Sequence, residues 1–444
     1  MKRYLINDLE NWKKSFNRKP LLLYGARQVG KTWLVRNFAA SHYDKLIELN
    51  FLTDETLKTI FDKNLTPGNI IQQLEFRFNT KIDPVRTLLF FDEIQESQRA
   101  MDSLKSFNNL QTESGQNFNI IAAGSFLGVM LGRRPVGQTD QITLYPMSFC
   151  EFLDALGKNI LTNAIKQCDI NVISGAGDLL ESLLKQYYYV GGMPAVVNEY
   201  ILSGDFAKVR ELQKELLTAY KGDFSKHIND SRTEPKIRML WDSISLHLIK
   251  ENKKFVYKNI KSGGRAAEFE NAMQWLVDTG LVYKINKVET PKLPLKMHYK
   301  EDFFKLYMLD IGLLGAQAEI SDSNILAAGS DIVDDMNGAL AEQFVCQELK
   351  AAGVSPLFYW GRENSTAEVD FLTQGGGEII PIEVKSAKHT KSQSLKVFMQ
   401  EFKPKYAIRT SLKNYGIDQS RFDSKLCSIP LYMISQGIKH ILRM

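Results

Sequence analysis

Cysteine is scarce in this sequence, and it occurs in no paired arrangement. The four cysteines among 444 residues stand far apart, and no two of them form a CxxC pair: Cys150, Cys168, Cys346 and Cys427. This spacing argues against both the usual zinc-binding pattern and a disulfide framework. We therefore expect four buried thiols in a reducing cytoplasm.

Long apolar runs and a secretion signal are also missing. No segment approaches the roughly 18 consecutive apolar residues of a membrane span. The N-terminal segment MKRYLINDLENWKKSF carries charges throughout, which predicts an amphipathic helix and not the apolar stretch of a signal peptide. We expect a cytoplasmic protein that has no membrane partner.

Neither sign of charge dominates. The 56 Lys and Arg residues nearly balance the 51 Asp and Glu residues, which leaves a formal charge of +5. This charge permits a nucleic-acid partner but does not demand one. Hydrophobic residues make up 44% and charged residues 24%, as in ordinary soluble globular proteins. At roughly 150 residues per domain, the length alone predicts two or three domains.

The first part of the chain alternates strand and helix patterns. Helical stretches separate five apolar segments that we expect to be strands, at residues 20–24, 45–52, 87–94, 118–125 and 141–147. Strands separated by helices favour a parallel sheet that is covered on both faces. We therefore predict an α/β domain over residues 1–148.

A phosphate-binding loop follows the first of these strands. The string GARQVGKT matches G-x-x-x-x-G-K-[ST], and it opens a predicted helix. In such a loop the backbone N–H groups and the helix N-terminus surround a phosphate. We expect Lys31 to reach the β- and γ-phosphates of ATP and Thr32 to ligate Mg²⁺. The predicted nucleotide-binding residues are Gly25, Ala26, Arg27, Gln28, Val29, Gly30, Lys31 and Thr32.

Two acids end the third predicted strand, LLFFDE at residues 88–93. Ligands of open α/β sheets bind at the carboxyl ends of the strands. We expect Asp92 to hold the Mg²⁺ shell and Glu93 to orient and polarise the attacking water.

Three further polar residues are candidates for the same site. Ser125 ends the strand IIAAGS, and its side chain would face the γ-phosphate if that strand lies beside the P-loop strand. A simple strand-ending turn is the alternative. Arg133 and Arg134 precede the fifth strand and could act on a neighbouring subunit as an arginine finger, which would require self-association. A solvated pair in a loop is the alternative for these two.

The middle of the chain changes character twice. Residues 149–230 have helical spacing of apolar residues and predict a helical lid. Residues 231–315 predict helices followed by two hairpin strands, the pattern of a winged-helix domain. The last helix carries Glu268, Glu270 and Asp278 against Arg265, a poor surface for phosphate. A structural spacer and a DNA reader both remain open.

The C-terminal region, residues 316–444, contains an ordered set of acids. Glu342 lies on a predicted helix, Asp370 on a strand, and I-E-V-K places Glu383 and Lys385 on one face of the next strand. This order resembles the PD-(D/E)xK nuclease core, with Val369 in place of the usual proline. In that core Asp370, Glu383 and Glu342 would bind Mg²⁺, and Lys385 would position the hydrolytic water or the scissile phosphate. An inert module of the same fold is the alternative.

Several strings together resemble one family. GARQVGKT, LLFFDEIQ, AAGS, LYPMSFCEFL, YYYVGGMPAVV, LDIGLL and GALAEQFV are similar to prokaryotic AAA-type ATPases of the archaeal-ATPase-like group. The resemblance spans almost the whole chain. It implies ATP hydrolysis, an AAA-like core, and a C-terminal domain of unknown function with a restriction-endonuclease-like fold.

Two functions are consistent with this sequence. In the first, ATP turnover is coupled to a nuclease-like domain that associates with DNA. In the second, the protein is a nucleotide-dependent switch whose inactive nuclease-fold domain recruits a protein partner. ATP and Mg²⁺ are the expected cofactors in both.

Overall fold

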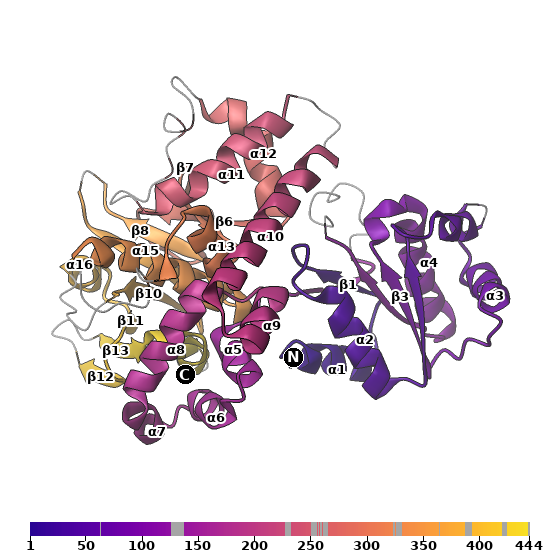
Figure 1. Ribbon diagram of the computed structural model, residues 1–444, viewed down its shortest axis with the longest axis horizontal. Helices are drawn as coiled ribbons and strands as arrows, with labels where there is room; N and C mark the ends of the chain where they lie inside the picture. The colour runs from indigo at the N-terminus through magenta and orange to yellow at the C-terminus, as the bar shows by residue number, and fades with distance from the viewer. Residues whose placement is uncertain are drawn as a thin grey trace. The chain divides into compact units, whose positions relative to one another are not determined.

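The computed structural model describes the chain in two compact units (Figure 1). The N-terminal unit comprises residues 2–145 and 278–280, and the C-terminal unit comprises residue 1, residues 146–277 and residues 281–444. The described residues are 1–442 except for 63, 126–136, 227–231, 250–254, 256, 258–259, 261–264, 323–324, 326–330, 364, 387–392 and 420–423.

The N-terminal unit alternates strands and helices. Its elements are α1 (Ile6–Lys14), β1 (Leu21–Tyr24), α2 (Lys31–His42), β2 (Lys45–Asn50), the 3₁₀ helix η1 (Glu55–Phe61), α3 (Pro67–Arg77), β3 (Thr87–Asp92), η2 (Ile94–Glu96), α4 (Gln98–Ser114), β4 (Asn119–Ala123) and β5 (Asp140–Thr143). The first four predicted strands correspond to β1, β2, β3 and β4. The fifth is shorter than predicted, because β5 ends at Thr143.

The five strands form one parallel sheet in the order β2-β3-β4-β1-β5. Every residue of β3 and β4 is buried, as expected for central strands covered on both faces. A parallel α/β sheet was predicted here, and the strand pairing confirms it. The order brings the carboxyl ends of β1, β3 and β4 to one edge of the sheet, with the P-loop strand directly beside β4.

The C-terminal unit holds the remaining elements. They are α5 (Phe149–Ala155), α6 (Asn159–Gln167), α7 (Ile170–Gly175), α8 (Gly177–Val190), α9 (Pro194–Ser203), α10 (Phe206–Lys226), α11 (Glu234–Ile249), α12 (Ala266–Asp278), β6 (Val282–Val288), η5 (Leu295–Met297), β7 (Tyr299–Met308), α13 (Ile311–Gln317), α15 (Asp331–Ala351), β8 (Phe358–Gly361), β9 (Glu368–Gly375), β10 (Glu378–Val384), α16 (Gln393–Phe402), β11 (Tyr406–Ser411), β12 (Gly416–Gln419), β13 (Lys425–Pro430), η6 (Leu431–Met433) and α17 (Ile434–Leu442).

One mixed sheet of eight strands runs through this unit, in the order β12-β13-β11-β10-β9-β8-β6-β7. The hairpin of β6 and β7, expected as the wing of a separate domain over 231–315, joins this sheet because β6 pairs in parallel with β8. The sheet therefore crosses the boundary expected at residues 315–316. Sequence periodicity shows the hairpin but cannot show which strand takes the open edge of β6.

The helical region and the sheet meet in a buried polar network. Asp310 accepts a hydrogen bond from the N–H of Gly192 at 2.6 Å, and the Gln347 amide donates to the Tyr187 hydroxyl at 2.8 Å. Gly191 has φ +75°, and a Cβ there would lie 2.2 Å from Asp310 Oδ1, so the site requires glycine. The tyrosines and the valine of YYYVGG, residues 187–190, are buried within this unit. The regions expected as lid, middle and nuclease-like domain belong to one compact unit.

The sequence predicted four buried thiols, and the structure places three of the four cysteines in buried positions. All four are free thiols, but Cys168 is half-buried, whereas Cys150, Cys346 and Cys427 are buried. Among the helices that the structure describes, none is long and apolar enough to cross a membrane.

Candidate functional site

The loop between β1 and α2 owes its shape to two glycines. Gly25 has φ +144°, and a Cβ at this position would lie 2.4 Å from the carbonyl oxygen of Leu144. Gly30 has φ +95° and precedes the first residue of α2, Lys31. Both conformations are accessible to glycine and strained for other residues. The glycine spacing of the motif therefore forms a tight loop that leads into a helix N-terminus.

Lys31 is folded back into this loop. Its ammonium group donates to the carbonyl oxygens of Gly25 and Ala26, both at 2.9 Å, and lies 3.3 Å from the hydroxyl of Ser125. The side chain is buried, and burial lowers its pKa to about 8, although the carboxylates of Glu93 and Asp92 oppose this shift. The pairing of β1 with β4 places Ser125 here, as the sequence argument required.

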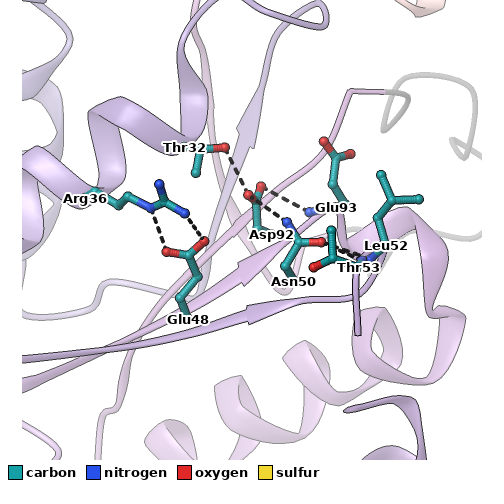
Figure 2. Close-up of polar contacts among 8 residues, drawn as sticks. All are labelled: Thr32, Arg36, Glu48, Asn50, Leu52, Thr53, Asp92 and Glu93. Carbon is teal, nitrogen blue, oxygen red and sulfur yellow. Dashed lines mark hydrogen bonds and ion pairs between the residues drawn. The ribbon is translucent and has the colours of Figure 1, made fainter. Parts of the chain in front are cut away.

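Thr32 and Asp92 meet across the sheet edge. The Thr32 hydroxyl donates to Asp92 Oδ2 at 2.9 Å (Figure 2). Asp92 is 3% exposed, and burial raises its pKa to about 6, against the opposing hydrogen bond from Thr32. A hydroxyl and a carboxylate in contact are the two oxygen ligands predicted for Mg²⁺, so these residues fit the ion.

Glu93 follows directly, in a left-handed backbone conformation with φ +51°. Its N–H donates to Asp92 Oδ1 at 3.1 Å, while its own carboxylate accepts from the Gln95 amide at 2.6 Å. In Figure 2 the carboxylate of Glu93 extends away from that of Asp92. The two acids therefore have different surroundings, which suits two different tasks.

Asn50 is a neighbour of this site that the sequence argument missed. It ends β2 in register with Asp92 of β3, and its amide nitrogen lies 3.5 Å from Asp92 Oδ2. Its amide oxygen accepts from the N–H groups of Leu52 and Thr53 (Figure 2), which fixes the side chain. The sequence did carry a signal for Asn50, because it is a polar residue at the carboxyl end of a predicted strand, where α/β sheets bind their ligands.

Arg3 is a second residue that was missed. Its buried guanidinium donates to the Val29 carbonyl of the P-loop at 2.7 Å and to the Tyr145 carbonyl at 2.6 Å. Arg3 therefore ties the loop to Tyr145, which lies two residues after the end of β5. An isolated arginine 22 residues before the motif gives no sequence signal of this contact. Arg133 and Arg134 lie outside the described residues.

The C-terminal acids gather on the eight-stranded sheet. Asp370 lies in β9, and its Oδ2 accepts from the Val384 N–H of β10 at 2.8 Å. Glu383 of β10 forms an ion pair with Lys385, at 2.8 Å between Oε1 and Nζ. Burial lowers the pKa of Lys385, but Glu383, Asp370 and Glu342 more than offset this and raise it. A turn at Gly375–Gly377 joins β9 to β10, and Gly376 and Gly377 have positive φ between these antiparallel strands.

Lys305 of β7 enters the same cluster and was not predicted. Its ammonium nitrogen lies 2.5 Å from Glu368, 3.6 Å from Glu342 and 4.0 Å from Asp370. Within the described part of the chain, no group of three or more His, Cys, Asp or Glu residues could hold a metal ion. The arrangement therefore does not fit the Mg²⁺ expected on Glu342, Asp370 and Glu383, since the ammonium group of Lys305 already lies beside two of these carboxylates.

Three family models match separate parts of the chain. Residues 17–153 match an AAA domain, residues 181–324 match a domain of unknown function (DUF8612), and residues 337–432 match another domain of unknown function (DUF4143). Segregation and condensation protein B of Clostridium perfringens is 24% identical over 203 residues, which are 38% of this chain and 98% of that protein.

Similar solved structures include two archaeal proteins. The Walker-type ATPase of Pyrococcus abyssi is 15% identical with a TM-score of 0.42, and the match covers 70% of this chain and 94% of that one. A signal transduction ATPase with numerous domains from Pyrococcus horikoshii is 14% identical with a TM-score of 0.26, over 79% of this chain and 45% of that one. The match of residues 17–153 to an AAA domain agrees with the parallel sheet and the phosphate-binding loop of the N-terminal unit, and this homology supports ATP binding and hydrolysis.

Proposed function

We propose that this protein binds ATP with Mg²⁺ and hydrolyses it at the edge of the five-stranded sheet. The observation that carries the proposal is the contact between the Thr32 hydroxyl and Asp92, at 2.9 Å. It joins the end of the P-loop to the end of β3, the two places from which a P-loop enzyme holds its metal ion. The match of this region to an AAA domain supports the same function.

Each residue has a role in this proposal. The N–H groups of residues 25–32 and the N-terminus of α2 surround the phosphates. Lys31 leaves the carbonyl groups of its own loop and turns toward the β- and γ-phosphates. Thr32 and Asp92 hold Mg²⁺, which neutralises charge on the phosphate oxygens when it is bound. Glu93 orients the attacking water and accepts its proton, and Ser125 faces the γ-phosphate.

Nucleotide binding is the first test. Fluorescent ATP should bind the wild type in the presence of Mg²⁺ and should fail to bind the Lys31→Ala variant, because the phosphates lose the cation that the motif assigns to them. Thr32→Val should weaken binding in Mg²⁺ far more than in EDTA, since the variant removes one metal ligand. Equal Mg²⁺ dependence in Thr32→Val and the wild type would contradict the assigned metal site.

For the C-terminal unit we favour the switch over the nuclease. Lys305, a cation that the nuclease pattern does not include, lies among the carboxylates that a nuclease would use for its metal. The described residues of α12 also present Glu268 and Glu270 to solvent, an acidic surface that does not suit a DNA phosphate backbone. In this proposal ATP turnover changes the conformation of the protein, and the C-terminal unit recruits a protein partner without cutting DNA.

One pair of assays separates the switch from the DNA-coupled nuclease. The switch predicts that double-stranded and single-stranded DNA leave ATP turnover unchanged and that plasmid DNA stays intact with Mg²⁺ or Mn²⁺. DNA-stimulated turnover would support coupling to nucleic acid. Nicking that disappears in Asp370→Ala and Lys385→Ala variants would establish the nuclease and refute the switch.

A further inference from the structure

Lys305 is a buried cation among carboxylates. It lies in β7 and is 1% exposed, and its ammonium nitrogen is 2.5 Å from Glu368 Oε1 and 3.6 Å from Glu342 Oε2. Asp370 Oδ1 is 4.0 Å away. Burial by itself lowers the pKa of Lys305. The three carboxylates together have the larger, opposite effect and raise the pKa above its usual value, so the amine stays protonated. A buried ammonium group without partners would instead lose its proton.

Two of these carboxylates also accept hydrogen bonds from neutral groups of the protein. Glu342 Oε2 accepts from the Tyr307 hydroxyl at 3.2 Å, and Asp370 Oδ2 accepts from the backbone N–H of Val384 at 2.8 Å. A Mg²⁺ ion requires near-octahedral oxygen ligands at about 2.0–2.1 Å and releases its water reluctantly. Binding at these oxygens would displace the donors that hold them and would place a second cation close to Lys305.

The cations come from separate strands. Lys305 belongs to β7, at one edge of the eight-stranded sheet, whereas Lys385 follows β10 and pairs with Glu383 at 2.8 Å. The carboxylates come from α15, β9 and β10. Gathered carboxylates repel one another unless a cation offsets them. In this cluster the chain itself supplies two cations.

We propose that Lys305 is the permanent counter-cation of the cluster formed by Glu342, Glu368, Asp370 and Glu383, and that this cluster takes no divalent metal ion in the native protein. Lys305 ties the β6–β7 hairpin to α15 and β9 by ion pairs. The cluster is then a structural joint within the C-terminal unit. This proposal is independent of ATP hydrolysis, which belongs to the other unit.

Manganese binding to the full-length protein tests the proposal directly. Free Mn²⁺ is measured by electron paramagnetic resonance without nucleotide, in the wild type and in an Asp370→Ala variant. We expect the two proteins to bind the same amount of Mn²⁺, because the cluster contributes none. A stoichiometric Mn²⁺ ion that the wild type binds and Asp370→Ala loses would overturn the proposal, whatever other variants do.

A substitution of the lysine tests the same idea in the opposite direction. Lys305→Met removes the charge but keeps much of the side-chain volume, so the carboxylates should repel one another. We expect a lower Tm than in the wild type and a rise of several degrees when Mn²⁺ is added, as the metal replaces the lost cation. A Lys305→Met protein as stable as the wild type, with no response to Mn²⁺, would contradict the role of Lys305.

Lys287 provides the matched control. It is another buried lysine of the same sheet, in β6, but among the described residues its only ion pair is with Glu289, at 2.9 Å. Lys287→Met should lower the Tm without creating a response to Mn²⁺, because no cluster of acids remains behind it. A similar Mn²⁺ response in both variants would show that the effect is not specific to the cluster. If Lys305→Met does not fold, the wild-type and Asp370→Ala comparison still decides the question.

Discussion

Replacing Lys31 by methionine should abolish nucleotide binding and at the same time stabilise the nucleotide-free N-terminal unit. The reason is that Lys31 keeps its charge in a buried place. Burial lowers its pKa from 10.5 to about 8. At about 1.4 kcal/mol for each pH unit, this difference corresponds to roughly 3 kcal/mol of destabilisation at pH 7. The charge of Lys31 thus destabilises the nucleotide-free protein but is available to bind phosphate.

The hydrogen bonds of the lysine reduce the gain. Lys31 donates to the carbonyl oxygens of Gly25 and Ala26, and the methionine would lose both interactions. At about 1 kcal/mol for each hydrogen bond, the net stabilisation in Lys31→Met is roughly 1 kcal/mol at neutral pH. The sign depends on pH. Lys31 is charged in both folded and unfolded protein below pH 8, so the penalty is complete there, and it disappears as pH rises from about 8 to 10.5.

Hydrogen exchange measured by mass spectrometry can follow this unit separately from the other. Peptides that cover β1 and β3 should exchange more slowly in Lys31→Met than in the wild type at pH 7. The difference should vanish at about pH 9, where the remaining penalty of roughly 2 kcal/mol equals the contribution of the two lost hydrogen bonds, and it should be reversed at about pH 10.5. ATP with Mg²⁺ at 100 times the Kd should stabilise the folded wild type by about 2.7 kcal/mol and slow its exchange accordingly. The same addition should leave the exchange rates of the variant unchanged. Faster exchange in nucleotide-free Lys31→Met at pH 7 would refute the reasoning.

Three other predictions concern separate features. If Arg133 or Arg134 acts on a neighbouring subunit, mixing its alanine variant with Glu93→Gln protein should restore some ATP hydrolysis, and turnover per chain that stays constant down to a proven monomer would exclude this. Arg3→Met should raise the Kd for ATP, because the Val29 carbonyl loses its buried donor; unchanged ATP titrations would show that the contact does not position the loop. Burial raises the pKa of Glu348 from 4.5 to about 7, so its ionisation should destabilise the protein by roughly 3 kcal/mol as pH rises through this range. Urea unfolding should show that the wild type loses stability between pH 4.5 and 7, whereas the Glu348→Gln variant does not. The same dependence of stability on pH in both proteins would contradict the raised pKa of Glu348.

Much of the N-terminal unit could be predicted from the sequence because its signals are local. The apolar run at residues 20–24, the glycine spacing and Lys31 follow one another directly, and the acids end a neighbouring apolar strand. Parallel α/β sheets place such strand ends at one edge. Arg3 could not be identified in this way. Its contact with Val29 depends on how α1 packs, which no local pattern encodes.

The C-terminal unit shows the limits of the same reasoning. Asp370, Glu383 and Lys385 were recognised because they are close in the sequence and belong to one hairpin. Lys305 was not, since it lies in a strand assigned to a different domain and reaches the acids only through the sheet order. The role of a carboxylate cluster depends on whether its cation comes from the chain or from solution. That difference is made by a residue distant in sequence.

Phosphate release from ATP by the purified full-length protein is the most direct test of the central claim. We predict Mg²⁺-dependent turnover in the wild type and none above background in Glu93→Gln, with fluorescent ATP bound equally by both proteins. Asp92 and Thr32 remain in that variant, so metal and nucleotide stay in place while the water loses its base. Equal turnover in Glu93→Gln and the wild type would contradict the role of Glu93, and a wild type that binds ATP but releases no phosphate would contradict the proposed ATPase.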